Sequence, residues 1–297
     1  MRLATFSRGG PVEVGAVVDE DAALVPLPAW GSMLELIDAR EEGLAQARAA
    51  ADADADRVAL DDVELLAPLP VPTQMRDCLA FEEHLRNAFA QSEKLTGVTR
   101  EIPDVWYEQP IYYKANRFSV VGPEHDVVWP PWSKTMDYEL ELACVLGRGG
   151  RDIPAEGALD HVFGYTIFND ASARDAQFRE MAGQLGPAKG KDFDTGNVLG
   201  PWLVTADELG DPQDCTMVAR VNGEEWSRGT SAAMHHSFAD IIAWISSAET
   251  LHPGEVIGSG TVGTGCGLEL GRYLENGDVV ELEIEGIGVL RNRFVTA

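Results

Sequence analysis

The sequence has few cysteines and few basic residues. Its four cysteines are scattered, with no C-x-x-C pair: Cys78, Cys144, Cys215 and Cys266. This argues against a disulfide framework or a spacing-defined zinc site and favours a reducing compartment. Only 23 Lys and Arg residues stand against 49 Asp and Glu, for a net charge of −26. That balance argues against nucleic acid or an anionic membrane as a partner, because both require basic surface.

Long hydrophobic runs are also absent from the sequence. No segment is apolar for long enough to span a bilayer, and the first twenty residues lack the apolar core of a signal peptide. We therefore expect a cytoplasmic protein. The 297 residues suffice for a large core, and 45% hydrophobic with 24% charged residues is ordinary for a folded chain.

Local patterns divide the chain into two parts. The first twenty residues predict a hairpin around Arg8–Pro11, and the spacing of apolar residues predicts a helix over 33–51. The Ala-Asp alternation of 51–56 is interpreted as a solvated helix end. The proline-rich segment 66–72 cannot continue a helix, so we predict a small N-terminal α/β domain at 1–70 and a main domain at 71–297.

Strands dominate the predicted main domain. They are expected at 118–121, 127–129, 139–146, 164–169, 202–204, 216–221 and 279–285, and helices at 172–181 and 238–248. Many short strands, frequent Gly and Pro and few helices favour a rolled, mostly antiparallel sheet. The fold class predicted is mixed α+β, mainly β.

Two carboxylates alternate along the apolar segment Asp137–Leu146. Because successive side chains of a strand point to opposite faces, Glu139 and Glu141 are expected side by side. The same face continues as Ala143 and Val145. Two like charges beside a buried face are costly unless a cation neutralises them, and Mg²⁺ or Ca²⁺ prefers such oxygen ligands. The alternative is an edge strand whose acidic side faces water.

Further polar residues follow the next predicted strand. Asp170 is most simply a helix N-cap, and beside the two glutamates it is alternatively a third oxygen ligand. Arg174 and Gln177 on the following helix are either surface residues or neighbours of that site. Lys191 lies in the Gly-rich loop 186–196, either exposed or placed to neutralise an anionic substrate.

His84 is a candidate general base, because it is one of six histidines and follows Glu82 and Glu83. The alternative is a structural or exposed histidine. His235-His236 precedes a helix and is interpreted as structural. Residues 258–263 match G-x-G-x-x-G, but no nucleotide-binding helix is expected to open on the last glycine, so we reject a nicotinamide oxidoreductase.

Taken together, these segments resemble the fumarylacetoacetate hydrolase family. The matching segments, in the family's order over about 71–297, are 137–142, 168–175, 191–194, 258–261 and 276–280. The resemblance implies a β-roll catalytic domain, a divalent cation (Mg²⁺, alternatively Mn²⁺ or Ca²⁺), a small anionic keto-acid substrate and a homodimer. It also implies a place in aromatic catabolism.

The resemblance also implies roles for individual residues. Metal ligands would be Glu139, Glu141, Asp170 and Asp77; catalytic residues would be His84, Glu269 and Lys191; substrate would contact Arg174, Gln177 and Thr261. Leu79 and Met181 replace substrate-contacting tyrosines of the tyrosine-degrading members. Asn87 replaces a glutamate of the acylpyruvase-like members, so the chemistry can be shared while the substrate differs.

These roles predict a metal-dependent hydrolase that cleaves a carbon–carbon bond in a small 1,3-diketo acid. His84, oriented by Glu269, would activate water, and Lys191 with Gln177 would stabilise the oxyanion. The alternative within the family is a decarboxylase, isomerase or hydratase of a 2-oxo acid. A non-catalytic metal-binding scaffold is a further alternative, opposed by the presence of acids, base and lysine together.

Overall fold

The computed structural model describes residues 1–53 and 56–297. Its N-terminal strands are β1 (Arg2–Ser7), β2 (Val12–Val18), β3 (Ala23–Pro26), β4 (Val58–Ala59) and β5 (Glu64–Leu66). β1 and β2 pair antiparallel, which confirms the predicted hairpin. Positions 54 and 55 of the acidic stretch 51–56 lie outside the described residues. β1 also pairs with β14 (Asn197–Thr205) of the main domain, and the division at residues 70 and 71 stays a prediction.

The helix predicted over 33–51 is two helices, α1 (Met33–Asp38) and α2 (Arg40–Asp52). The break coincides with Arg40, whose φ of 53° lies outside the right-handed helical region. A Cβ on Gly43 would lie 2.6 Å from the carbonyl oxygen of Leu36, so the glycine permits the close approach of α2 to α1. Apolar spacing alone does not reveal such a break.

In the described part of the chain, the main sheet has 12 strands in the order β4-β3-β2-β1-β14-β12-β11-β17-β6-β7, with β5 and β8 beside it. Its further strands are β6 (Met75–Cys78), β7 (Tyr112–Lys114), β8 (Val120–Val121), β11 (Leu140–Leu146), β12 (Val162–Asp170) and β17 (Val256–Gly258). A second sheet of five strands contains β16 (Glu224–Thr230), β15 (Thr216–Val221), β18 (Val279–Ile284), β19 (Gly288–Thr296) and β9 (Val127–Trp129). Most neighbours pair antiparallel, so the predicted mixed fold, mainly β, is confirmed.

Several strand predictions differ from the structure at their ends. The strand predicted at 202–204 is the longer β14, which continues through Gly200-Pro201. Pro201 has no N–H to donate, and the pairing with β12 is irregular at this level, between Tyr165 and Ile167. The helix predicted at 172–181 begins later, since Ser172–Ala173 forms β13 and pairs with β10 (Met136–Asp137).

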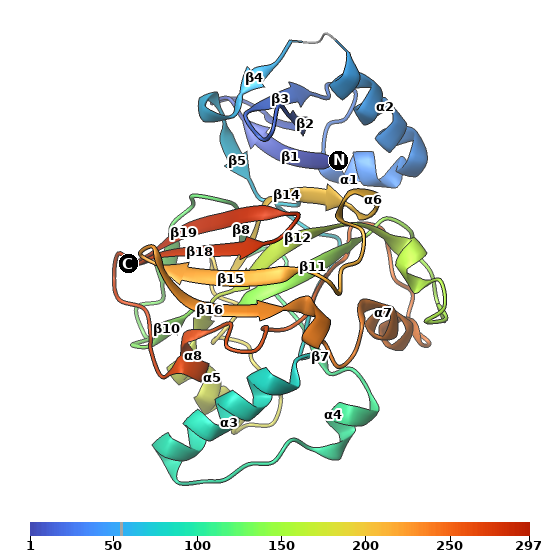
Figure 1. The fold of residues 1–297 in the computed structure, drawn as a ribbon. Helices are drawn as coiled ribbons and strands as arrows, with labels where there is room; N and C mark the ends of the chain where they lie inside the picture. Colours follow the sequence, from blue (N-terminus) through green and yellow to red (C-terminus); the bar gives the residue numbers. More distant parts are fainter. Residues whose placement is uncertain (54–55) are drawn as a thin grey trace.

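The remaining helices are mostly short. They are α3 (Glu82–Thr96), α4 (Asp104–Glu108), α5 (Arg174–Met181), α6 (Ala206–Leu209), α7 (Phe238–Ser246) and α8 (Gly267–Leu270), with 3-10 turns at Leu60–Asp62, Ala158–His161 and Ser231–Ala233. Figure 1 shows α3, α5 and α8 at the end of the molecule away from the N-terminal strands. No helix in the described ranges is both long and apolar enough to cross a membrane.

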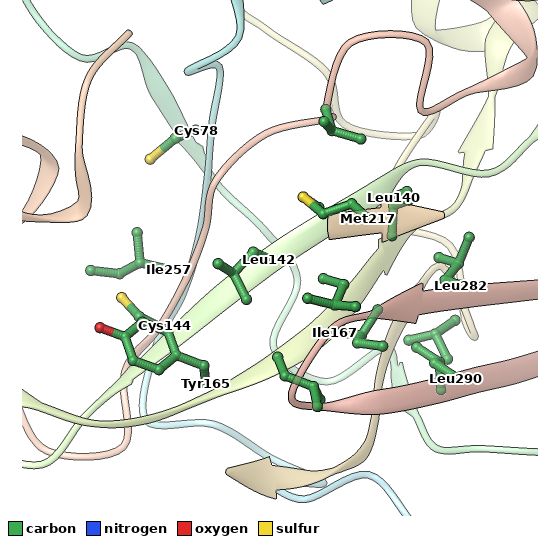
Figure 2. Close-up of a cluster of buried hydrophobic side chains, with 14 of the residues drawn as sticks. Cys78, Leu140, Leu142, Cys144, Tyr165, Ile167, Met217, Ile257, Leu282 and Leu290 are labelled. Atoms are coloured by element: carbon green, nitrogen blue, oxygen red, sulfur yellow. The ribbon is translucent and has the colours of Figure 1, made fainter. Parts of the chain in front are cut away.

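β11 lies between β12 and β17, and both of its faces are buried. One face packs toward the five-stranded sheet, and Figure 2 shows its core side chains Leu140, Leu142, Cys144, Tyr165, Ile167, Met217, Leu282 and Leu290. Ala143 and Val145 lie in a second buried cluster on the opposite face. The edge-strand interpretation is therefore wrong, and Glu141 points into a face without access to water.

Candidate active site

Three carboxylates meet where strands of the main sheet lie side by side. Asp77 is in β6, Glu141 is near the start of β11 and Asp170 ends β12; one ligand oxygen of each lies within 4.8 Å of the others. Gly258 of β17 lies between β11 and β6. A Cβ there would come within 2.6 Å of Asp77 Oδ1 and 2.7 Å of Glu141 Oε2, so a glycine at this position lets the carboxylates converge.

This carboxylate cluster (Asp77, Glu141 and Asp170) is buried and incompletely neutralised. Each of the three keeps one oxygen with no hydrogen-bond partner among the described residues: Asp77 Oδ1, Glu141 Oε1 and Asp170 Oδ1. Burial raises the pKa of Asp77 to about 6. Burial and the neighbouring acids raise the pKa of Glu141 well above its ordinary value. Converging, unpaired oxygens fit a hard divalent cation. Its charge would offset both the cost of burying ionised carboxylates and their mutual repulsion.

Glu139 lies outside that cluster and has protein cations as partners. Its Oε1 is 2.7 Å from Arg174 Nη1, and its Oε2 accepts a hydrogen bond of 2.6 Å from Lys191 Nζ. The segment before β11 is irregular, with Glu139 in a single bridge to Cys266. Regular strand pairing therefore begins at Leu140, and the role of Glu139 as a metal ligand stays a prediction.

The partners of Glu139 form a paired network with Asp137 (Asp137, Glu139, Arg174 and Lys191). Arg174 Nε donates to Asp137 Oδ2 at 2.8 Å, and Lys191 also donates to Asp170 Oδ2 at 2.5 Å. Burial alone would raise the pKa of Glu139, but Lys191 and Arg174 hold it well below its ordinary value. Burial opposes the charge of Lys191, but Asp170 and Glu139 raise its pKa above the ordinary value. Glu139 and Lys191 therefore stabilise each other's charge inside the protein.

Lys191 is fully engaged by protein oxygens. Its Nζ donates to Glu139 Oε2, to Asp170 Oδ2 and, at 3.4 Å, to the Asp170 carbonyl oxygen. An ammonium has three donors, so a substrate would have to replace one of these acceptors. The alternative of an exposed loop charge is wrong, since Lys191 is buried. The oxyanion-stabilising role stays a prediction.

His84 and Glu269 form a buried pair between α3 and α8. His84 Nδ1 lies 2.8 Å from Glu269 Oε1, while Glu269 Oε2 accepts from the Asn87 side chain and from the Thr264 backbone. Burial would raise the pKa of Glu269, but the hydrogen bond from His84 and the other donors lower it. An ionised Glu269 holds the proton on Nδ1, leaving Nε2 as the proton acceptor. The exposed-histidine alternative is wrong.

The other predicted site residues lie around this centre. Gln177 is half-buried and its Oε1 accepts from Arg174 Nη1 at 2.9 Å. Thr261 is buried on the loop after β17, beside Gly260, whose N–H donates to Glu141 Oε2 at 3.1 Å. Contact of either with substrate stays a prediction. The N-cap interpretation of Asp170 is wrong, because Ala173 is the N-cap of α5.

Two sequence motifs were not assigned to the site: the His235-His236 pair and the glycine match at 258–263. His236 Nε2 bonds to the Trp106 carbonyl oxygen, and His235 packs on the Trp106 ring, consistent with the structural interpretation. After the glycine match a helix does begin, but it is the four-residue α8, which starts at Gly267 and not on Gly263. Its contribution is Glu269.

Sequence reasoning missed two partners of the site, the buried Asp137 and the half-buried Tyr113. Asp137 accepts hydrogen bonds from the backbone N–H groups of Gly267 and Leu268 while it pairs with Arg174, so it joins α8 to the paired network. Tyr113 of β7 donates its hydroxyl to Asp170 Oδ2 at 2.7 Å. The only signal for Asp137 is its place at the start of the acidic segment; nothing in the sequence marks Tyr113.

Comparisons with known proteins agree with this arrangement. A family described as "Fumarylacetoacetate (FAA) hydrolase C-terminal" matches residues 74–295. The human protein "Oxaloacetate tautomerase FAHD2A, mitochondrial" is 36% identical over 284 residues, 95% of this chain and 84% of that one. The structure of a fumarylacetoacetate hydrolase from Exiguobacterium antarcticum matches with a TM-score of 0.80 and 30% identity, covering 100% of both chains.

A further solved structure bears on the cation. It is a maleylpyruvate hydrolase from Sphingobium sp. SYK-6 in complex with a manganese(II) ion and pyruvate, with a TM-score of 0.79, 26% identity and 100% of both chains covered. Together with the carboxylate cluster, it supports a divalent metal site in this enzyme. By its matched domain, its relatives and its fold, this chain belongs to the fumarylacetoacetate hydrolase family.

Proposed function

We propose that this enzyme is a divalent-metal-dependent tautomerase, which interconverts the keto and enol forms of a small acidic 2-oxo acid such as oxaloacetate. The reaction class is supported by the human relative named as an oxaloacetate tautomerase, with which the chain shares 36% identity over nearly its whole length. The site supplies what this reaction needs: a base for a proton on carbon, and positive charge for the enolate oxygen.

The single observation that carries the proposal is the His84–Glu269 pair. With the proton on Nδ1 directed to Glu269 at 2.8 Å, Nε2 can take a proton from the carbon next to the 2-oxo group. Glu269 then stabilises the imidazolium that forms, as the acid of a triad does. Returning the proton to carbon or to oxygen completes keto–enol exchange without any bond cleavage between carbons.

The other residues of the site would bind the cation and the anionic substrate. Asp77, Glu141 and Asp170 would hold the cation, which when bound supplies Lewis-acid stabilisation of the enolate; we expect Mg²⁺, with Mn²⁺ able to replace it. Arg174 and Gln177 would orient the carboxylate of the substrate. Because most of these groups are buried, little water is available to compete for the proton.

A second candidate is the hydrolysis of a carbon–carbon bond in a 1,3-diketo acid. The same Nε2 can take a proton from water, and both of the solved structures described above are named as hydrolases. In that reaction the hydroxide would attack the distal carbonyl and the same enolate would leave. The two candidates therefore differ in whether His84 acts on a carbon-bound proton or on water.

One panel of assays separates the candidates. Oxaloacetate tautomerisation, followed by the enol absorbance, is compared with hydrolysis of acylpyruvates and of fumarylacetoacetate, each with Mg²⁺ and after dialysis against a chelator. Tautomerisation without cleavage supports the proposal, and cleavage without tautomerisation supports the hydrolase. Full activity of the dialysed enzyme would overturn the metal dependence.

The same assays test the base. His84→Ala should lower the rate by about 10² to 10⁴, the range for a positioned general base. The affinity of the carboxylate cluster for Mg²⁺ should not change. Glu269→Gln should lower it less, because it only orients and stabilises the base. His125→Ala, which removes an exposed histidine on the loop before β9, is the matched control. Near-normal turnover of His84→Ala would remove His84 from the mechanism.

The homodimer and the cytoplasmic location also stay predictions. A two-fold dimer is the commonest closed assembly of folded chains. Light scattering of the purified chain decides this point, and a monomeric mass would contradict it.

A further inference from the structure

A thiol lies beside the catalytic pair and has no part in the proposed reaction. Cys266 Sγ is 3.4 Å from Glu269 Oε1 and 4.0 Å from His84 Nδ1, and the latter two atoms are 2.8 Å apart. All three residues are buried, and each offers one ligand atom within 4.8 Å of the others. The result is a compact group of one nitrogen, one sulfur and one oxygen donor.

The group is held in place by its surroundings. Cys266 is the N-cap of α8, which carries Glu269 in its first turn, while His84 is in the first turn of α3. Gln91 of α3 also donates its side-chain amide to the Glu269 carbonyl oxygen, tying the two helices together. An ion that bound here would therefore meet ligands already close to position.

The donor types select a different ion from the one at the carboxylate cluster. Nitrogen and sulfur donors favour Zn²⁺ and similar borderline ions, whereas Mg²⁺ prefers the all-oxygen set of Asp77, Glu141 and Asp170. A thiolate and a carboxylate with a neutral imidazole would also balance one dication. The buried group would then be neutral, which avoids the cost of an isolated charge.

We propose that His84, Cys266 and Glu269 form a second metal site, for a borderline dication such as Zn²⁺, whose occupation inhibits the enzyme. The thiol releases its proton to solvent when the Zn–S bond forms. The imidazole proton moves from Nδ1 to Nε2 through solvent as Nδ1 becomes a ligand, and no electrons are exchanged. Nε2 then has no lone pair for a substrate proton. The binding of Zn²⁺ does not depend on the proposed function, but the inhibition rests on it.

Cobalt tests the binding without any assay of activity. The full-length chain, saturated with Mg²⁺, is titrated with Co²⁺, and the near-ultraviolet band of a Co²⁺–thiolate bond is recorded. We expect the band in the wild type and in Cys215→Ser, a control thiol in the connection before β15, and its loss in Cys266→Ser. No band in the wild type, or a band that persists in Cys266→Ser, would overturn the proposal. If Cys266→Ser does not fold, Cys266→Ala serves instead, with folding checked by circular dichroism.

Zinc tests the inhibition. In saturating Mg²⁺, Zn²⁺ should inhibit the wild type and Cys215→Ser alike, and half-inhibition of Cys266→Ser should need at least about tenfold more Zn²⁺. Equal inhibition of wild type and Cys266→Ser would overturn the regulatory role. If the chain lacks tautomerase activity altogether, the proposed function fails, yet the cobalt band still decides whether the site exists.

Discussion

The carboxylate cluster and the paired network are neighbouring groups of buried acids whose charges are balanced in different ways. In the paired network, Glu139 and Asp137 have Arg174 and Lys191 as partners. In the carboxylate cluster, Asp77 and Glu141 converge with an oxygen each left unpaired among the described residues. One group is completed by the protein's own cations, and the other requires a cation from solution. Loss of one acid should therefore have opposite consequences in the two groups.

The largest effect is expected from Glu141→Gln, which removes a charge and a ligand from the carboxylate cluster. Divalent-ion affinity should collapse and turnover should fall by roughly 10³-fold, because a catalytic metal contributes several kcal/mol of transition-state stabilisation. Without metal, this variant should melt at a higher temperature than wild type, since like-charge repulsion is relieved. Isothermal titration with Mn²⁺ measures the affinity, and thermal melts measure the stability. Unchanged Mn²⁺ affinity would show that Glu141 is not a metal ligand.

Glu139→Gln makes the matched change in the paired network and should act in the opposite direction on stability. It leaves Lys191 and Arg174 short of one carboxylate, although Asp170 and Asp137 remain beside them. We expect a loss of about 3 kcal/mol in the free energy of unfolding, the lower end for breaking a buried ion pair. Urea unfolding of the metal-free proteins measures it. A collapse of Mn²⁺ affinity as well would make Glu139 a metal ligand, as predicted from the sequence.

A pH series tests the carboxylate cluster directly. The pKa of Asp77 is about 6 in the folded chain, against an ordinary value of 3.8, so the folded, metal-free chain binds more protons than the unfolded one in that interval. The stability contributed by the protonated acid is full below about pH 4 and is lost as pH rises through about 6. Mg²⁺ should therefore raise the melting temperature more above pH 6 than below it. An equal rise at both pH values would show that the cluster does not bind the ion.

The smallest effect is expected from Asp137→Asn. Asn keeps an oxygen for one backbone N–H at the start of α8 but removes the charge that faces Arg174. We expect a loss of about 1.5–2 kcal/mol in the free energy of unfolding, at the lower end of the range for a hydrogen bond to a charged group. Asp38→Asn, at an exposed acid that ends α1, is the control. A larger loss of unfolding free energy in the control would show that the effect of Asp137→Asn does not come from the paired network.

Much of the fold could be predicted because its signals are local. The hairpin of β1 and β2, the strands β9 and β15, and the helix α7 with its Ser237–Asp240 capping box all follow from periodicity and turn chemistry. The break between α1 and α2 could not be predicted, since apolar spacing gives no sign of the positive φ at Arg40. The short pairing of β10 with β13 likewise joins segments too brief for a periodic pattern.

The sequence alone determined that acids, a histidine and a lysine occur in an order shared with one family. It also placed Glu141 in a strand and Asp170 at the end of the next one. Only the tertiary structure decided which acid is paired by protein and which is left for an ion. Asp137 lies 130 residues from Gly267, and Glu139 lies 52 from Lys191. Charge balance in a buried site depends on distances between side chains of remote segments, and these distances exist only once the sheets have formed.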